Sequence, residues 1–353
     1  MSAPHVMIMA AGTGGHIFPG LAVAERLMAD GVTVSWLGTP QGLENRLVPA
    51  RGIDMAQIDI SGLRGRGALG WLKAPFRVLR AMLSARRIFK SQRPDCVLSM
   101  GGYVAGPGGL MARLMGIPLL LHEQNAVAGL TNRCLRPFAR RVLTGFPQVL
   151  PNGEHCGNPV RREIAELPAP TKRYRQRTGP LRVLVVGGSQ GAAAFSRLVP
   201  AALALIPEHQ RPQVTHQAGR QQAKTLEAYE SLSVEANVIE FIDDMAAAWG
   251  EVDVAICRSG ALTVAELAAA GVPAVLVPFP YAVDDHQTAN AKYLSDAGAA
   301  WLMPENTLTA EQLASHLMTL EREMLLGMAE RARALAMPDA VDAAARACRE
   351  VCQ

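Results

Sequence analysis

The sequence has few of the residues that mark metal-binding, disulfide-linked or membrane-spanning proteins. Its six cysteines, scattered from Cys96 to Cys352, form no CxxC pair and no mixed Cys/His zinc spacing, so we expect buried, reduced thiols. No DxD motif occurs, and no apolar run reaches the ~18 residues that a membrane helix needs. The first residues lack the basic start and long apolar stretch of a secretory signal. These absences favour a cytoplasmic protein.

The 353 residues suit two domains of roughly 100 to 200 residues each, and charge is divided unevenly between the two parts. Residues 1–158 contain 17 Lys and Arg against 8 Asp and Glu, a net charge of +9. The remaining residues contain 18 against 23, a net charge of −5, which together give the chain's +4. A surface for an anionic partner is therefore expected in the first part.

Short aliphatic runs alternate with helical patterns, and the alternation occurs twice. The first series is HVMIMA, VTVSWLG, DCVLSM, IPLLLHE and RRVLTGF, and the second is LRVLVV, QVTHQA, NVIEFI, VDVAIC and VPAVLVPF. Strands separated by helices predict parallel sheets that are buried on both faces. Because the pattern restarts after about 175 residues, the sequence predicts two doubly wound, Rossmann-like α/β domains, with ligand at the carboxyl ends of the strands.

The domain boundary is expected in a proline-rich stretch. Residues 156–180 contain four prolines and many charges but no strand-like run. We therefore expect domains at 1–160 and 161–338. The last segment, 339–353, has a helical composition, which by itself allows packing on either domain.

Two glycine-rich loops follow corresponding strands, MAAGTGGHIFPG at 9–20 and VVGGSQGA at 185–192. A strand, a glycine turn and a helix bring free N–H groups and a positive helix end to one point, which suits phosphate. A dinucleotide site would also need an acid at the end of the next strand, but those strands end in SWLGTP and THQAGR. The sequence therefore disfavours NAD.

Further polar groups follow the strands of the second part. Glu266 lies about two turns into a helix after the turn at Ser259 and Gly260, and the pattern alone favours a solvated carboxylate there. Asp284, Asp285 and His286 cluster like metal ligands, yet a polar loop is the better interpretation, and we expect no metal. Several polar loops that meet at one sheet edge indicate a binding site.

At these residues the sequence resembles the MurG family of bacterial glycosyltransferases. The resemblance runs from residue 8 to about residue 295, through GTGGHIFPG, GGYVAGPGG, HEQNAVAGLTN, GNPVR, GGSQGA and RSGALTVAEL…GVPAVLVPFPYAVDDHQTANA. It implies a GT-B architecture, transfer of N-acetylglucosamine from UDP-GlcNAc to the muramoyl 4-hydroxyl of lipid I to give lipid II, and no cofactor. The acceptor domain is expected first and the UDP-GlcNAc domain second, with the C-terminal helix returned to the first.

The resemblance also implies which residues bind UDP-GlcNAc. Ile242 is expected to contact the uracil through its backbone, Glu266 the ribose hydroxyls and Gln287 the sugar hydroxyls. Thr288 follows Gln287 where the family often has a second glutamine, so a secondary sugar contact is not expected. The remaining residues implied in the site are Thr13, Gly14, Gly15, Asn125, Arg161, Ser189, Ala261, Leu262, Thr263, Val264 and Ala265.

Transfer from an α-linked UDP sugar to a β-glycoside inverts the anomeric carbon, so the simplest mechanism is one displacement by a deprotonated acceptor hydroxyl. That displacement needs a base and a means of holding the departing pyrophosphate. We expect His16 to be the base, with a backbone-capping histidine as the alternative; His122 and Glu123 compete for the role or are hydrogen-bonded groups at a strand end. The loop at Ser189 to Gly191, a helix dipole and Arg161 are expected to hold the pyrophosphate without a metal.

Residues 61–94 contain nine Lys and Arg, no acid, and apolar residues at helical spacing. One interpretation is a structural helix of the domain whose charged side chains are merely solvated. No nucleic-acid motif accompanies the basic residues, so we expect no nucleic acid as a partner. A cationic surface with apolar residues instead suits anionic lipid, at the cytoplasmic face of the bacterial inner membrane. The nearby glycine loop Met100–Gly109 is either a contact for the lipid pyrophosphate or a close turn.

Two other functions share parts of this pattern. A UDP-GlcNAc 2-epimerase has the same two-domain plan and sugar nucleotide, but it needs no lipid-facing surface. A non-catalytic UDP-sugar sensor would keep Glu266 and Gln287 but has no need of His16.

Overall fold

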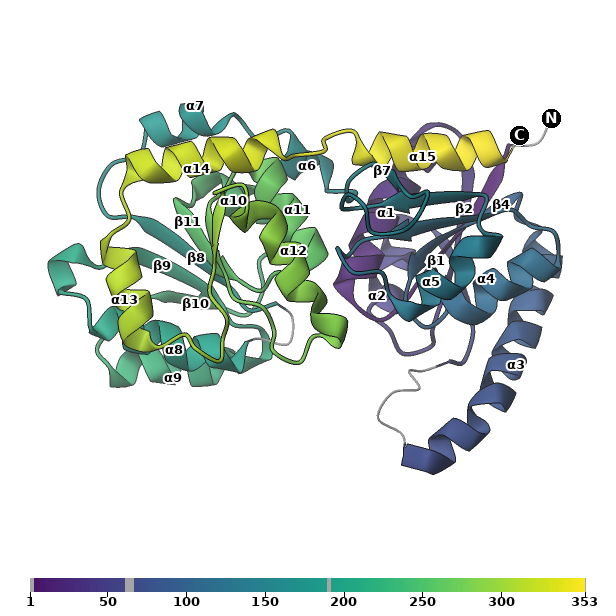
Figure 1. The fold of residues 1–353 in the computed structure, drawn as a ribbon, viewed down its shortest axis with the longest axis horizontal. Helices are drawn as coiled ribbons and strands as arrows, with labels where there is room; N and C mark the ends of the chain where they lie inside the picture. The colour runs from purple at the N-terminus through teal and green to yellow at the C-terminus, as the bar shows by residue number, and fades with distance from the viewer. Residues whose placement is uncertain (1–2, 61–66, 189–191, 353) are drawn as a thin grey trace. The chain divides into compact units, whose positions relative to one another are not determined.

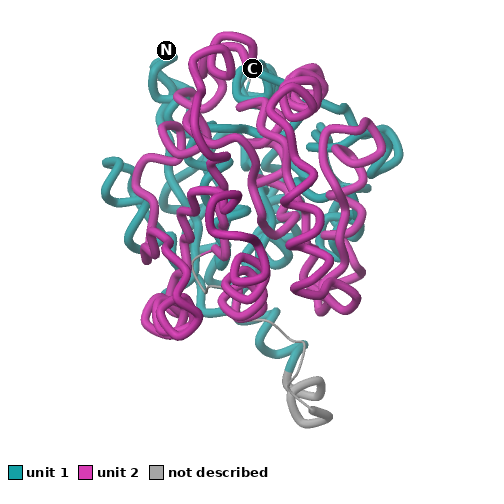
Figure 2. The backbone as a smooth tube through the Cα atoms, turned by 90° about the vertical axis from the view of Figure 1, so that its left-hand side faces the viewer, with its two compact units in different colours: residues 1–161, 337–353 teal, residues 162–336 magenta. Residues whose placement is uncertain are grey.

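The computed structural model describes residues 3–60, 67–188 and 192–352, with only the backbone of residues 67–73. The chain divides into two compact units (Figure 2). Unit 1 comprises residues 1–161 and 337–353, and unit 2 comprises residues 162–336. Among the described residues, every helix is too short or too polar to cross a bilayer.

Unit 1 is built on a parallel sheet in the order β3-β2-β1-β4-β5-β6-β7, with helices packed on it (Figure 1). The order reverses between β1 and β4, which makes their carboxyl ends the switch point where such folds bind ligands. Its elements are β1 (His5–Ala10), α1 (Gly14–Ala29), β2 (Thr33–Gly38), α2 (Glu44–Leu47), η1 (Pro49–Arg51), β3 (Asp54–Gln57), α3 (Gly67–Gln92), β4 (Cys96–Gly101), α4 (Ala105–Leu114), β5 (Leu119–Glu123), α5 (Leu130–Leu135), η2 (Arg136–Phe138), β6 (Arg141–Thr144), β7 (Glu154–His155) and α15 (Ala340–Val351).

Strand β1 shows why the apolar runs form central strands. Side chains of consecutive strand residues point to opposite faces of the sheet. Val6 and Ile8 therefore join the buried cluster that contains residues of α1, whereas Met7 and Met9 join the cluster that contains residues of α3 and α4. Because both faces are covered, the strand is apolar at nearly every position.

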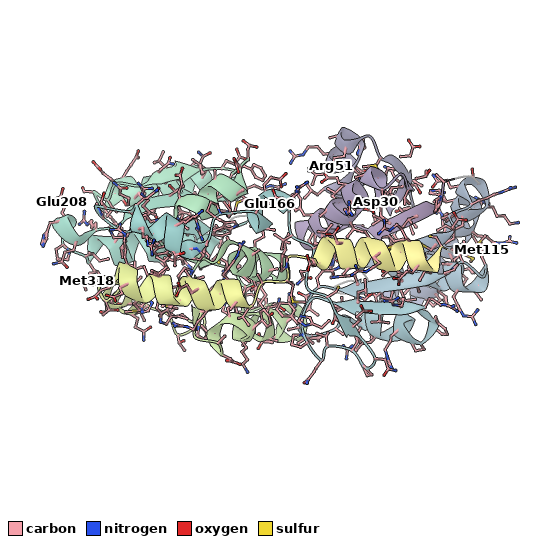
Figure 3. All side chains as sticks on the ribbon, turned by 90° about the horizontal axis from the view of Figure 1, so that it is seen from above. Asp30, Arg51, Met115, Glu166, Glu208 and Met318 are labelled. Atoms are coloured by element: carbon pink, nitrogen blue, oxygen red, sulfur yellow. The ribbon has the colours of Figure 1, made fainter. Side chains whose placement is uncertain are left out.

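The last helix, α15, packs in unit 1 against α1 and β4. It buries alanines on one face and places charged residues beside partners on other elements. Arg349 donates to Asp30 at 2.6 Å, next to the helix in Figure 3, and Arg141 donates to Glu350 at 2.8 Å. Alanine packing brings α15 close to α1, and these ion pairs join α15 to the end of α1 and to β6.

Unit 2 repeats the plan with a parallel sheet in the order β10-β9-β8-β11-β12-β13 (Figure 1). Its switch point lies between β8 and β11, which pair in parallel. The elements are α6 (Arg162–Ala165), α7 (Pro170–Arg175), β8 (Arg182–Val186), α8 (Ala193–Ala204), η3 (Glu208–Gln210), β9 (Gln213–Gln217), η4 (Gly219–Gln221), α9 (Gln222–Ser231), β10 (Asn237–Ile239), α10 (Met245–Glu251), β11 (Val254–Cys257), α11 (Ala261–Ala270), β12 (Ala274–Leu276), η5 (Val283–Asp285), α12 (His286–Ser295), β13 (Ala300–Leu302), α13 (Ala310–Met318) and α14 (Arg322–Ala334).

The two-sheet architecture and the expected apolar strands are confirmed, with some differences. The short strands β3, β7 and β13, which lie outside the two predicted series, complete the sheets. The proline-rich stretch carries the short helices α6 and α7, and unit 2 begins at Arg162, so Arg161 belongs to unit 1. The expectation of buried thiols is wrong for Cys134, which is exposed on α5; no cysteine of the described residues forms a disulfide.

Candidate functional site

The first glycine loop connects β1 to the start of α1 at the switch point of unit 1. Thr13 is the N-cap of α1, with an extended backbone, and its carbonyl accepts from the N–H of His16 at 3.1 Å. Gly14 and Gly15 form the first turn of the helix, where backbone N–H groups have no partner within the helix. The arrangement suits an anionic or strongly polar ligand group.

The His16 ring is held between two neighbouring strand ends. Its Nδ1 lies 3.2 Å from Oε1 of Gln124, which follows β5. Gly101, the last residue of β4, also packs against the ring, because a Cβ there would stand 3.2 Å from Cε1 of His16. Gly102 approaches the first loop even more closely, since its Cβ would lie 2.5 Å from the carbonyl oxygen of Ala11. The turn between β4 and α4 therefore packs closely against the first loop at Gly102, while residues 105–109 of the expected glycine loop begin α4.

His122 and Glu123 occupy the end of β5 and are both buried. His122 Nε2 lies 3.0 Å from the Gly157 carbonyl, and burial lowers the pKa of His122 to about 4. The Glu123 carboxylate accepts from the N–H groups of Asn125 and Gly129, each at 3.0 Å. The interpretation of His122 and Glu123 as hydrogen-bonded groups at a strand end therefore fits the structure better than a role as base.

Asn125 and Arg161, both implied in the site, lie in unit 1. The backbone N–H of Asn125 donates to the carboxylate of Glu123, and this hydrogen bond fixes the start of the loop after β5. The Arg161 guanidinium lies 5.6 Å from the ring centre of Phe18, a cation–π contact on α1. Arg161 thus stands beside the helix that begins at the first glycine loop.

Glu44 supports the first loop, and no sequence pattern indicated it. The side chain is fully buried and accepts from the Gly12 N–H at 3.2 Å and from the Thr39 N–H at 3.0 Å. The hydroxyl of Thr39 adds a third bond at 2.7 Å. A carboxylate with three donors is stable without a cation, and here it ties the loop to β2.

The second glycine loop follows β8, and Ser189 lies outside the described residues. Before it, the Gly188 N–H donates to Oε1 of Gln217 at 2.9 Å, and Nε2 of Gln217 donates to the Gly188 carbonyl at 3.2 Å. Nε2 also donates to the carbonyl of Glu240 at 2.7 Å. Gln217 therefore sets the start of this loop; its only sequence signal is its position at a strand end.

The segment implied to contact phosphate and ribose begins α11. Gly260 is the N-cap, Ala261 to Glu266 form the first turns, and Ala261, Val264 and Glu266 are buried while Leu262, Thr263 and Ala265 are half-buried. The Nε1–H of Trp249 donates to Oε2 of Glu266 at 3.2 Å. The solvated carboxylate that the pattern alone favoured is therefore wrong, because Glu266 is 5% exposed and hydrogen-bonded.

Gln287, on the first turn of α12, accepts at Oε1 from the Phe279 N–H at 2.9 Å. This bond leaves its amide N–H groups as donors. Asp284 and Asp285 before it both have left-handed backbones, with φ of 53° and 50°. In the described ranges, no three His, Cys, Asp or Glu side chains gather in the manner of a metal site.

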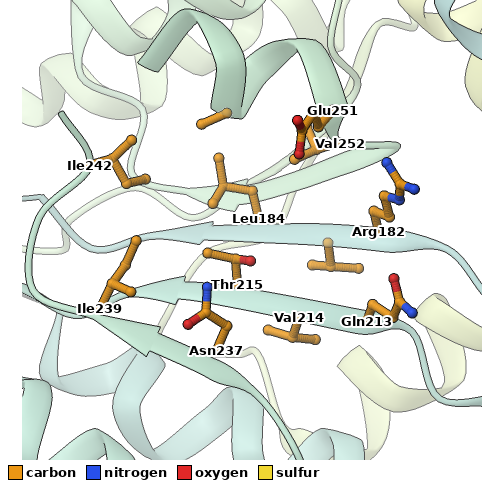
Figure 4. Close-up of a pocket in the computed structure, with 12 residues that line it drawn as sticks. Arg182, Leu184, Gln213, Val214, Thr215, Asn237, Ile239, Ile242, Glu251 and Val252 are labelled. Atoms are coloured by element: carbon orange, nitrogen blue, oxygen red, sulfur yellow. The ribbon is translucent and has the colours of Figure 1, made fainter. Parts of the chain in front are cut away.

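A cavity of about 660 Å³ lies on the sheet of unit 2 beneath α10 (Figure 4). Ile242 and Ile239 stand at one end, where the strands finish, and Arg182 and Gln213 stand at the other, where β8 and β9 begin. Only the Ile242 end of this cavity reaches the carboxyl ends of the strands, where the glycine loop and α11 begin. The rest of the cavity extends toward the amino ends of β8 and β9.

Both halves of the chain match known domains. Residues 6–144 match the glycosyltransferase family 28 N-terminal domain, and residues 182–346 match the glycosyltransferase family 28 C-terminal domain. Together with the two parallel sheets, these matches define a glycosyltransferase of the two-domain GT-B class.

Individual proteins narrow the assignment. The UDP-N-acetylglucosamine–N-acetylmuramyl-(pentapeptide) pyrophosphoryl-undecaprenol N-acetylglucosamine transferase of Bordetella petrii is 58% identical over 351 residues, 99% of this chain and 98% of its own. The crystal structure of Acinetobacter baumannii MurG aligns with a TM-score of 0.85 and 46% identity, over 98% and 99% of the two chains. A UDP-GlcNAc 2-epimerase from Neisseria meningitidis covers 98% and 100% with a TM-score of 0.68, but at 12% identity it shares the fold alone. The chain belongs to the MurG family.

Proposed function

We propose that this enzyme transfers N-acetylglucosamine from UDP-GlcNAc to the 4-hydroxyl of the muramoyl sugar of lipid I, which gives lipid II and UDP. The observation that carries the proposal is the close likeness, over nearly the whole chain, to a transferase named for that donor and that acceptor. The 2-epimerase is the weaker alternative, because it is similar only in fold.

We assign the nucleotide sugar to unit 2. At its switch point, α8 follows β8 and α11 follows β11, so two helices begin at the carboxyl ends of neighbouring strands. Helix N-termini favour the negative charge of a pyrophosphate. Buried Glu266 on α11 suits the ribose hydroxyls, and the amide of Gln287 suits the hydroxyls of the sugar. Ile242 would bind the uracil at the edge of the sheet.

The chemical step that we propose is one displacement with inversion. The acceptor oxygen attacks the anomeric carbon, its proton moves to His16, and the bond from that carbon to the UDP oxygen breaks. The departing charge is held by backbone N–H groups and helix N-termini, together with Arg161, so the step needs no metal ion.

A labelled donor tests the activity directly. The protein is incubated with UDP-GlcNAc labelled in the sugar, with and without lipid I, in the presence of a chelator. We expect label in the lipid fraction only when lipid I is present. Label found as an epimer would support the 2-epimerase, unchanged donor would support a sensor, and loss of transfer on chelation would contradict the metal-free step.

We also propose that α3 binds an anionic membrane surface on the cytoplasmic side. On this helix Phe76, Leu79 and Leu83 are exposed, while Ala81 and Ala85 are buried in the cluster shared with α4. With 3.6 residues per turn, the exposed apolar residues lie roughly opposite the buried face. Exposed cations accompany this stripe, namely Arg77, Arg80, Arg86, Arg87 and Lys90. An apolar stripe among cations suits insertion at the level of anionic head groups.

A further inference from the structure

We infer that Gln124 is a positioning residue that sets the tautomer of His16, so that Nε2 carries the lone pair that accepts the proton of the acceptor hydroxyl. The inference rests on the proposed role of His16 as base and adds to it a reason for the reactive nitrogen. It is carried by a chain of hydrogen bonds from Gly157 through His122 and Gln124 to His16.

This series of hydrogen bonds begins at the backbone carbonyl of Gly157, a group that can only accept. The Gly157 carbonyl accepts hydrogen bonds and cannot donate, so Nε2 of His122, 3.0 Å away, must carry a proton. His122 is fully buried, and its pKa of about 4 keeps the ring neutral at physiological pH. A neutral imidazole with a proton on Nε2 has its lone pair on Nδ1.

The lone pair on His122 then orients the amide of Gln124. The amide nitrogen lies 3.2 Å from Nδ1 of His122 and 3.1 Å from the His122 carbonyl oxygen, and both of these accept. Only an NH₂ group satisfies two acceptors, so the amide oxygen must point the other way. Gln124 is 1% exposed, and its own carbonyl accepts from Nδ2 of Asn158 at 3.0 Å, so the residue is held on both sides.

The amide oxygen decides the protonation of His16. It lies 3.2 Å from Nδ1 of His16 and can only accept, so Nδ1 must donate. In the neutral ring the lone pair then resides on Nε2. When Nε2 takes the proton from the acceptor hydroxyl, the bond from Nδ1 to Gln124 persists and the imidazolium keeps its orientation. Gly101, packed against the ring, restricts its rotation.

This arrangement differs in one respect from a histidine paired with a carboxylate. An amide oxygen selects which nitrogen is protonated but adds no charge beside the ring. Gln124 therefore acts on the tautomer of His16 and not on its charge. This role predicts a spectroscopic signature that a residue with only a packing role would not produce.

The test is nitrogen-15 NMR of the full-length protein labelled in histidine, with His16 signals assigned by their loss in His16→Ala. We expect His16 to carry its proton on Nδ1. His5 is an internal reference for the same tautomer, since its Nδ1 faces the Gln92 carbonyl at 3.0 Å, and His122 is the reference for the opposite one. In Gln124→Leu we expect His16 to populate both tautomers while His5 is unchanged.

Turnover provides the second measurement. Without the bond to Gln124 the ratio of the two tautomers shifts about five- to tenfold against Nδ1–H, and we expect kcat of Gln124→Leu to fall by up to that factor. KM for UDP-GlcNAc should stay unchanged. Gln124→Glu keeps an acceptor toward His16, so we expect it to restore the Nδ1–H tautomer and to recover part of kcat at neutral pH, whereas a packing role would favour the apolar Leu.

The outcomes separate this inference from the proposed function. A His16 that carries its proton on Nε2 in the unmodified enzyme, or that keeps its tautomer in Gln124→Leu, overturns the inference. Near-normal turnover of His16→Ala would instead overturn the role of His16 as base, whatever the tautomer. Thermal melting of each variant verifies that it is folded.

Discussion

The indole Nε1–H of Trp249 points at the carboxylate of Glu266 across 3.2 Å, and neither side chain is more than 5% exposed. A buried carboxylate is costly unless hydrogen bonds satisfy it, and an indole supplies a single donor. Ribose hydroxyls are donors of the kind that such a carboxylate accepts.

Glu266→Gln should therefore weaken UDP binding, because the amide replaces two acceptor oxygens by one. We expect affinity for UDP to fall about tenfold, as for one lost hydrogen bond to a charged group. Affinity for 2′,3′-dideoxy-UDP should hardly change, and calorimetry can measure both. Glu251→Gln, which alters an acid at the cavity in the same unit, is the matched control. Equal losses for both nucleotides would contradict a ribose contact.

His16→Ala should reduce kcat by about 10²- to 10⁴-fold, since positioned acid–base groups contribute that much to turnover. KM for UDP-GlcNAc should be little affected, because a base acts on the acceptor hydroxyl and not on the donor. Steady-state kinetics with lipid I measure both constants. His209→Ala removes an exposed histidine and should leave both unchanged. A His16→Ala enzyme with near-normal kcat would remove this residue from the role of base.

Gly101→Ala should displace the His16 ring, because the new Cβ would stand 3.2 Å from its Cε1. Gly101 also has φ of 100°, so the substitution strains the backbone by about 1–2 kcal/mol. Gly116→Ala has a comparable positive φ of 73° but meets no atom within 4 Å. We expect both variants to melt earlier and only Gly101→Ala to lose kcat; equal kinetics would show that the contact is irrelevant.

Replacing Phe76, Leu79 and Leu83 together by Ser should weaken binding to anionic vesicles. Each buried apolar side chain contributes about 1.5–3 kcal/mol, so the loss should exceed about tenfold. Sedimentation with phosphatidylglycerol vesicles at low and high salt measures it, and high salt should release the unmodified protein. Leu226→Ser, on an exposed leucine of unit 2, should bind normally. Binding to neutral vesicles that salt does not affect would contradict the proposal.

Acid should destabilise both units through one buried histidine in each. Burial lowers the pKa of His122 and of His216 to about 4, whereas the unfolded chain has the ordinary value of 6.5. Between these values the unfolded state binds more protons, so stability falls as pH drops from 6.5 toward 4. Each histidine contributes about 3 kcal/mol over the whole window.

Urea unfolding at several pH values measures this dependence. His216→Asn replaces a titrating ring by an amide that can still bond to the Tyr229 hydroxyl, 3.1 Å from Nδ1 of His216. We expect a smaller loss of stability on acidification in this variant, even if it is less stable at neutral pH. An unchanged pH slope would show that His216 does not titrate as described.

Local patterns in the chain were sufficient to predict most strands of both sheets, because a strand buried on both faces is apolar at most positions. The first glycine loop was equally readable, since small residues leave room for a helix to start soon after such a strand. The family followed from long motifs at these same turns. The short edge strands β3 and β7 were not predicted. Each has only two to four residues, all at least partly exposed, which is too few for a distinctive pattern of hydrophobicity.

What folding added concerns groups that are distant in sequence and adjacent in space. Glu266 reads as a solvated helical acid until Trp249 covers it, and nothing near Glu44 reveals that its carboxylate supports the loop at Gly12. The hydrogen bonds that connect His122 through Gln124 to His16 join residues up to 108 positions apart in the sequence. Which atom donates in each of them depends on one backbone carbonyl, at Gly157. Burial and hydrogen-bond direction are properties of the packed chain, so periodicity and composition identify His16 as a candidate but cannot say which of its nitrogens is poised to react.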